Sequence, residues 1–167
     1  MAARALPLLF LPLAAALGAP AGAVTQTAVV SANVSKPLTL AALQNLDLGT
    51  ITLSLGSWSG AAVGISRTGV FTCSARLICT GAPQTARFKL TGSNKAVVLI
   101  TAPDVTMINQ SDPTQRLTLA LDSPSQVTLT SSGEPGVNFD IGGTLTLTSS
   151  VAEGTYSGTI QVTVDYQ

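Results

Sequence analysis

Apolar and polar residues alternate with a period of two over most of this chain. Residues 86–91, for example, read Ala-Arg-Phe-Lys-Leu-Thr, and similar short runs recur between glycine, proline, serine and asparagine residues. Because the side chains of a strand point alternately to its two faces, these runs predict half-buried β-strands. Many short strands separated by turns predict an all-β fold, an immunoglobulin-like, Greek-key β-sandwich of antiparallel strands, with a closed β-barrel as the alternative.

The expected strands follow these runs and cover residues 27–40, 46–53, 86–91, 97–100, 106–109, 117–121, 127–130, 137–141, 145–147 and 156–166. Residues 97–100 are continuously apolar, which favours burial on both faces. Residues 54–66 are rich in glycine, serine and alanine and are expected to form a loop that carries Trp58. Gly142 and Gly143 separate two runs and indicate a bulge or a turn.

Residues 1–23 have the three parts of a secretory signal peptide. Arg4 supplies a positive start, residues 5–17 are apolar, and residues 21–23 (Ala-Gly-Ala) form a cleavage site of small residues. The apolar run is shorter than the roughly 20 residues that a membrane-spanning helix needs. We therefore expect export through the periplasm to the cell surface or the medium, cleavage before Val24, and a single domain over residues 24–167 with no membrane insertion after cleavage.

The composition argues against several classes of function. Only 10% of the residues are charged, the formal net charge is zero and the chain has no histidine. A neutral chain without a basic stripe is not expected to bind nucleic acid. Histidine-based catalytic triads and zinc clusters are excluded, and the acidic residues form no recognisable pair. We expect no catalytic residue, no metal site and no cofactor, and therefore no enzyme activity.

Cys73 and Cys79 are the only cysteines. In an exported protein two cysteines most often pair, so we expect a disulfide that closes a short ring.

The C-terminal run, residues 154–167, ends the printed sequence on an alternating strand. Its even-numbered positions share one face and include Tyr156, Gly158, Ile160, Val162, Val164 and Tyr166. An exposed final strand of this kind promotes aggregation unless something pairs with it. Either the fold covers this strand internally, or a strand from another chain does.

The same run resembles the terminal strand of chaperone–usher pilins. The positions that carry this resemblance are Gly154, Tyr156, Ile160, Val162, Val164 and Tyr166. The resemblance implies that the terminal strand pairs first with a strand of a periplasmic chaperone. The N-terminal extension of another subunit then replaces the chaperone, and an usher is the second assembly partner. Physically, this is addition of a strand to a sheet edge.

Residues 24–36 supply a candidate donor strand directly after the cleavage site. Ala28, Val30, Ala32 and Val34 form an apolar row on one face of this segment. The row departs from the pilin pattern because its side chains are small and the segment runs straight into the next strand. It could equally be the first strand of its own domain.

A second resemblance covers nearly the whole chain after the signal peptide. Four motifs occur in order, at residues 37–40 (Pro-Leu-Thr-Leu), 46–51 (Leu-Asp-Leu-Gly-Thr-Ile), 141–145 (Ile-Gly-Gly-Thr-Leu) and 154–159 (Gly-Thr-Tyr-Ser-Gly-Thr). They are similar to those of the secreted bacterial family catalogued as domain of unknown function 4402. That family has no established activity, and it is similar to fimbrial subunits in its export signal and terminal strand. The Cys73–Cys79 pair lies outside the matched pattern.

Two hypotheses about function follow. The first is an exported structural subunit of a pilus-like or fimbrium-like surface assembly, with a role in cell adhesion, that polymerises with copies of itself or related subunits by strand complementation. The second is a self-complete secreted binding module, for which Trp58 in its loop would be a candidate carbohydrate contact.

Overall fold

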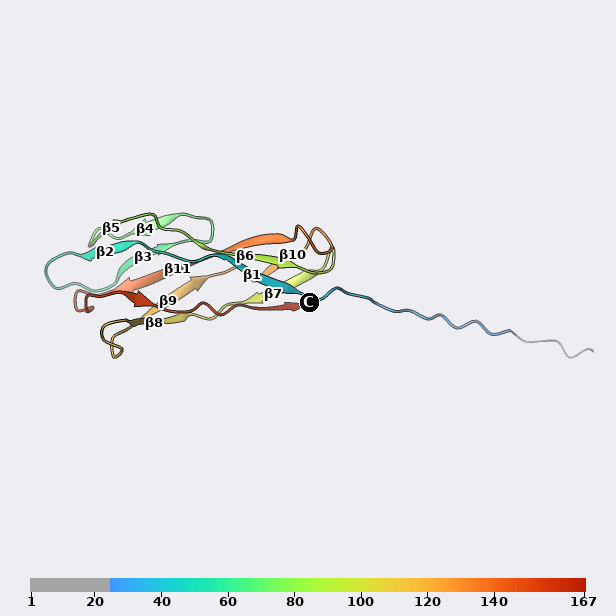
Figure 1. The fold of residues 1–167 in the computed structure, drawn as a ribbon. Coiled ribbons are helices and arrows are strands. Elements are labelled where there is room, and N and C mark those ends of the chain that lie inside the picture. Colours follow the sequence, from blue (N-terminus) through green and yellow to red (C-terminus); the bar gives the residue numbers. More distant parts are fainter. Residues whose placement is uncertain (1–24) are drawn as a thin grey trace, which may run out of the picture. The chain divides into compact units, whose positions relative to one another are not determined.

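The computed structural model describes residues 25–167, so the expected signal peptide and Val24 lie outside the described residues. The chain divides into two units, Met1–Asn33 and Val34–Gln167. Residues 25–33 of the first unit contain no strand or turn. The second unit contains strands and no helix, and most of its strands are labelled in Figure 1.

Thirteen strands are present in residues 34–167. In chain order they are β1 (Thr39–Gln44), β2 (Thr50–Leu53), β3 (Ala61–Ile65), β4 (Phe71–Cys73), β5 (Leu77–Thr80), β6 (Ala86–Thr91), β7 (Val97–Thr101), β8 (Val105–Asn109), β9 (Arg116–Asp122), β10 (Gln126–Thr128), β11 (Val137–Leu147), β12 (Tyr156–Ser157) and β13 (Thr163–Tyr166). All the pairs they form are antiparallel. The expected all-β fold is confirmed.

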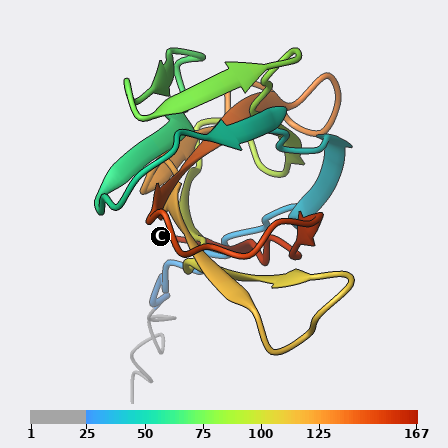
Figure 2. The same cartoon turned by 90° about the vertical axis from the view of Figure 1, so that its left-hand side faces the viewer.

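The largest sheet has eight strands. Six follow the order β1-β6-β11-β9-β8-β12, while β3 pairs with β11 and β4 pairs with β3. Two smaller sheets have the orders β10-β7-β13 and β2-β5. The sheets curl round the interior, as the view along the length of this unit shows (Figure 2). This curled arrangement of antiparallel sheets is consistent with a β-sandwich or a barrel-like fold.

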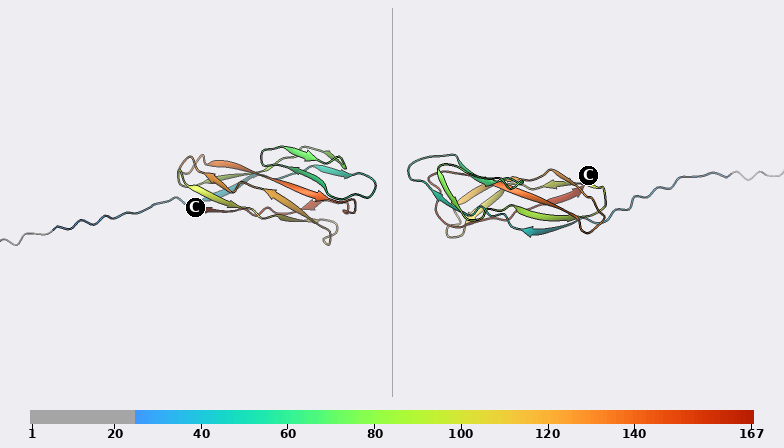
Figure 3. Two further views of the ribbon diagram at one scale, coloured as in Figure 1. Left: turned by 180° about the vertical axis from the view of Figure 1, so that it is seen from behind. Right: turned by 90° about the horizontal axis from the view of Figure 1, so that it is seen from above.

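The long strand β11 passes through the middle of the unit (Figure 3). Its first half pairs with β6 and its second half with β3 and β9. Gly142 and Gly143 therefore lie inside one continuous strand, with no register shift against β9, and the expectation of a bulge or a turn there was wrong. A Cβ at Gly142 would collide with the carbonyl oxygen of Ile65, so glycine permits the close approach at which β11 changes neighbours.

Two buried apolar clusters form the core. The first contains side chains from β3, β9 and the second half of β11, among them Val63, Leu119 and Leu145. The second joins β6 and the first half of β11 to β7, and the rings of Phe88 and Phe139 stack within it at 5.6 Å. Because β7 and β6 belong to different sheets, this second cluster packs one sheet face on another.

Three strand expectations need correction. Residues 27–38 form no strand, and β1 begins only at Thr39. Residues 61–65, expected to be loop, are the buried strand β3, whose small residues suit close packing against β11. β7 is buried on one face only, because Leu99 is 41% exposed between buried Val98 and Ile100.

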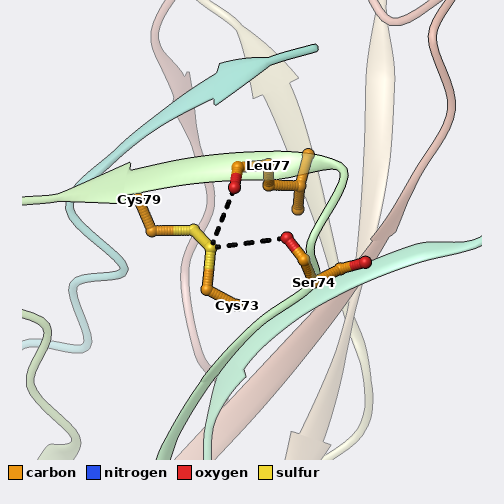
Figure 4. The surroundings of a disulfide bond; sticks show 4 residues. All are labelled: Cys73, Ser74, Leu77 and Cys79. Carbon is orange, nitrogen blue, oxygen red and sulfur yellow. Dashed lines mark hydrogen bonds between the residues drawn. A yellow bond between two sulfur atoms is a disulfide. The ribbon is translucent and has the colours of Figure 1, made fainter.

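Cys73 and Cys79 form the expected disulfide, shown in Figure 4. The bond joins β4, which belongs to the large sheet, to β5, which pairs with β2. Cys73 Sγ also lies 3.7 Å from the carbonyl oxygen of Leu77. The disulfide thus ties the two-stranded sheet to the large one.

Candidate functional site

The two ends of the large sheet flank an open groove. β1 and β12 are the terminal strands of the path β1-β6-β11-β9-β8-β12. Residues of both strands, including Ala42 and Tyr156, line a cavity of about 470 Å³. The sheet has therefore curled until its two edges border the same space without hydrogen-bonding to each other.

A second cavity of about 900 Å³ continues this space along the chain. It is lined by residues 47–53, which include β2, and by residues 151–156, which lead into β12. Met107 and Tyr156 line both cavities. We call the combined space the groove; its walls are residues 42–53 on one side and residues 151–160 on the other.

The walls of the groove are sheet edges. β1 pairs with β6 and β2 with β5, while β12 pairs with β8, and no second neighbour is present for these strands in residues 34–167. Residues 42–46 share one cavity with residues 156–160, and residues 47–53 share the other with residues 151–156. The first and last strands therefore run in opposite directions along the groove.

The floor of the groove is apolar. Buried side chains of both core clusters reach it, among them Phe88, Leu119 and Leu145. Met107 and Leu117 of β8 and β9 line it as well and are only partly buried. An apolar floor between two sheet edges is the arrangement that binds an extended strand, since the edges supply backbone hydrogen bonds and the floor receives alternate side chains.

The family of the chain can be read from its sequence over the same region. A model of the family described as Domain of unknown function (DUF4402) matches residues 38–166. The chain belongs to the DUF4402 family. The match runs from the residue before β1 to the last residue of β13, so it spans both walls of the groove. No curated protein and no solved structure matches the chain.

The C-terminal strand of this DUF4402 domain is divided in two. β12 pairs with β8 and β13 pairs with β7, and residues 158–162 between them form no ladder. The prediction of a single strand over residues 156–166 was therefore wrong. The strand is divided because its partner is also interrupted, between Thr101 and Val105, where Pro103 has no N–H to donate. One edge of the C-terminal strand is thus covered within the chain.

Alternation nevertheless persists through the division. Five of the six predicted pairing residues are partly buried, while Gly154 and the odd-numbered neighbours are exposed; the five are Tyr156, Ile160, Val162, Val164 and Tyr166. Ile160 packs against both core clusters. This face therefore points to the core of its own DUF4402 domain, and the edge of β12 away from β8 has no ladder partner among residues 34–167.

Gly154 has a local role that its position in the motif did not reveal. Its φ is +141°, and a Cβ there would lie 2.6 Å from Asn109 Nδ2. Asn109 is 1% exposed; its Nδ2 donates to the carbonyl oxygen of Glu153, and its Oδ1 accepts the N–H groups of Ser111 and Asp112. Gly154 thus leaves room for a buried amide that joins two loops at one end of the groove.

Replacing Gly154 by alanine is expected to lower the free energy of unfolding by about 2–3 kcal/mol, because the backbone conformation is strained for any other residue and the new methyl group displaces Asn109. Urea unfolding followed by circular dichroism measures the change. Gly56→Ala is the matched control, because Gly56 also has positive φ but nothing lies within 4 Å of a Cβ there. Equal losses in the two variants would contradict the role of Asn109.

Sequence reasoning missed Asn109 and Met107. The chain around Asn109 reads Asn-Gln-Ser-Asp, a cluster of turn-forming residues, and that signal could have located the buried amide. Met107 belongs to an expected strand, but nothing in the sequence indicates that the end of a curled sheet exposes it.

Trp58 lies between the loop and the first core cluster. Its side chain is partly buried against that cluster, and its indole N–H donates to the carbonyl oxygen of Ser54 at 3.0 Å. Its backbone N–H donates to Ser149 Oγ. Trp58 therefore covers part of the core, and a contact with carbohydrate stays a prediction.

The candidate donor residues do not belong to a strand. Ala28, Val30, Ala32 and Val34 are exposed, Val30 by 92% and Val34 by 91%. Residues 25–35 carry no charged side chain, and the acidic residues Asp47 and Glu153 are the charged residues that line the groove.

By contrast, the outer face of β6 and β11 is charged, and the hydrogen bond and the charge of Asp140 raise the pKa of Arg87 there.

Residues 25–167 hold no helix long and apolar enough to cross a membrane. They also hold no group of three or more histidine, cysteine, aspartate or glutamate side chains placed to bind a metal ion.

Proposed function

We propose that this DUF4402 protein is an exported structural subunit of a pilus-like or fimbrium-like surface assembly, and that it polymerises by strand complementation. One observation carries the proposal: β1 and β12, the two edges of one curled sheet, border the same apolar groove. One added strand would pair with both edges and cover the floor. The role is structural rather than catalytic.

Residues 24–36 of a second copy are the proposed occupant of the groove. The segment lies before the part of the chain that matches the family, residues 38–166. Its described part, residues 25–36, forms no strand and exposes Val29, Val30 and Val34, and the segment is about as long as the wall formed by residues 42–53. A segment of this kind buries little apolar surface unless it pairs with the edge of a sheet.

The terminal strand supports the same proposal from the other wall. It resembles the terminal strand of chaperone–usher pilins at Gly154, Tyr156, Ile160, Val162, Val164 and Tyr166. Under the proposal a periplasmic chaperone occupies the groove before assembly at an usher, and the donor segment of another subunit replaces it. Because the donor segment is uncharged up to Ser35, assembly depends little on salt concentration.

Removal of the donor segment tests the proposal. The protein that begins at Val24 is expected to form linear polymers, and the protein that begins at Ser35 is expected to stay monomeric, because the groove is retained and the added strand is lost. Size-exclusion chromatography with light scattering and negative-stain microscopy measure the difference. A self-complete binding module predicts the same monomer in both cases, and that result would remove the proposal.

A further inference from the structure

A third cavity lies on the outer face of the large sheet, apart from the groove. It has a volume of about 400 Å³ and shares no lining residue with the two cavities of the groove. It is lined by Arg87 of β6, by residues 138–140 of β11, by residues 67–68 in the turn between β3 and β4, and by Pro124 and Val127 beside and within β10. We call this cavity the outer pocket.

The outer pocket exists because the neighbours of β11 change at Gly142. Gly142 pairs with Asp122, where β9 ends, and the next strand, β10, pairs with β7 instead. Residues 137–141 therefore have β6 on one edge and no ladder partner on the other within the described chain. A Cβ at Gly142 would lie 2.6 Å from the backbone nitrogen of Arg67. Because side chains two residues apart share a face of a strand, the backbone at Arg67 lies on the same face of β11 as Asp140.

Arg67 has hydrogen-bond donors left for a ligand. Its backbone N–H donates to Asp122 Oδ2 at 2.8 Å, and its Nη1 donates to the carbonyl oxygen of Ser123 at 3.1 Å. Nη1 also lies 3.7 Å from Asp122 Oδ1, which is too far for a hydrogen bond. A guanidinium group has five N–H donors. Nε and Nη2 thus make no hydrogen bond among the described residues, and together they form the planar fork that binds a carboxylate with two hydrogen bonds.

The other polar groups of the outer pocket are already in place. Arg87 donates to Asp140 through two parallel hydrogen bonds, Nε to Oδ1 at 2.7 Å and Nη2 to Oδ2 at 3.0 Å. This pair fixes the Asp140 carboxylate, whose oxygens can each accept a further hydrogen bond. The exposed amide of Asn138 lies two residues away on the same face and can both donate and accept. Groups that are held before binding lose little side-chain entropy when a ligand arrives.

We propose that the outer pocket binds a sugar ring that carries one carboxylate group, which makes it a second site beyond the proposed function. The fork of Arg67 binds the carboxylate, and Asp140 and Asn138 bind the ring hydroxyl groups. Pro124 and Val127 meet the C–H face of the ring. The volume of the outer pocket lies within the range of about 300–1,000 Å³ that small-molecule sites occupy, and it suits a single ring.

Charge and hydrogen bonding favour this ligand over a neutral sugar or an acidic peptide. Two cationic residues, Arg67 and Arg87, and one anionic residue, Asp140, line the outer pocket. One ligand carboxylate balances the excess positive charge of this set. An acidic peptide brings further carboxylates, which Asp140 repels, and its acidic side chains offer no hydroxyl group for Asp140 to bind.

Saturation-transfer difference NMR with the protein that begins at Val24 tests the proposal, because the method observes the ligand whether the protein is monomeric or polymeric. The probes are glucuronate, galacturonate and N-acetylneuraminate, each compared with its uncharged methyl ester. At least one acid is expected to bind with a Kd on the order of 1 mM and at least tenfold more tightly than its ester, because the ester lacks the charge-assisted hydrogen bonds to Arg67. No binding by any of the three acids, or equal binding of acid and ester, would overturn the proposal.

Substitutions locate the bound sugar. Arg67→Ala is expected to weaken binding of the acid at least about tenfold, whereas Arg67→Lys keeps the charge without the planar fork and recovers only part of the loss. Asn138→Ala removes one exposed amide and should weaken binding about fivefold. Arg116→Ala is the matched control, because Arg116 is an exposed arginine of β9 that does not line the outer pocket. Equal affinities of the Arg67→Ala and Arg116→Ala proteins would place the sugar elsewhere and overturn the site.

A competing peptide distinguishes the sugar from an acidic protein partner. A peptide of four glutamate residues is not expected to displace the acid sugar. Displacement at equal concentration would assign the outer pocket to acidic proteins and overturn the sugar proposal. None of these results depends on strand complementation, so a failure here leaves the proposed function standing.

Discussion

A synthetic peptide of residues 24–36 is expected to raise the melting temperature of the protein that begins at Ser35 by about 10 °C when its concentration is about 100 times Kd. Binding to the folded state alone contributes about 2.7 kcal/mol under this condition. For a domain of this size each kcal/mol raises the melting temperature by about 4 °C. Differential scanning fluorimetry at increasing peptide concentration measures the shift.

The size of this effect follows from what the groove leaves incomplete. Without an added strand, the groove-facing backbone edges of β1, β2 and β12 remain without ladder partners, and Met107 and Leu117 on the floor are only partly buried. Under the proposal, the peptide supplies backbone partners to both walls at once. A scrambled peptide of the same composition is the control, because it has the same solubility but not the alternating row. A shift that is equal for both peptides would show that the groove does not recognise the sequence of the segment.

The class of fold could be predicted from alternation alone, because a period of two has one structural meaning. Residues 86–91 and 137–141 show this period without interruption, and both are strands whose alternate side chains are buried. Glycine misled the prediction in two places. Residues 61–65 and the pair Gly142-Gly143 looked like loop or turn, yet the small residues allow β3 and β11 to pass closely as strands.

The residues of the candidate site were only partly predictable. The even-numbered face of the C-terminal strand was found because its alternation is local in the sequence. The sequence did not reveal the opposite wall, residues 42–53, or the floor residue Met107. Both depend on a sheet of eight strands that curls until β1 and β12 border one space. The hydrogen bonds of Tyr166 with Lys36 and Ser93 also join distant parts of the chain, so no local sequence pattern predicts them.

Substitution of Val30 by aspartate in the donor segment is expected to weaken binding of the peptide to the Ser35–Gln167 protein about 100-fold. Val30 belongs to the row with Ala28, Ala32 and Val34 that faces the apolar floor of the groove under the proposal. Placing a carboxylate there without a partner costs about 3 kcal/mol. Isothermal titration calorimetry with the variant peptide measures Kd.

The neighbouring residue supplies the control. Val29 is the same residue type and is equally exposed in the described chain, at 97% against 92% for Val30. Because alternate side chains of a strand point to opposite faces, Val29 would face away from the floor, and Val29→Asp should change Kd less than about threefold, within the range of ordinary surface substitutions. Equal losses from the two substitutions would show that the segment does not bind as a strand. A larger loss from Val29→Asp would show that the odd-numbered side chains, and not the even-numbered ones, face the floor. The expected result, a larger loss from Val30→Asp, places Ala28, Val30, Ala32 and Val34 against the apolar floor of the groove.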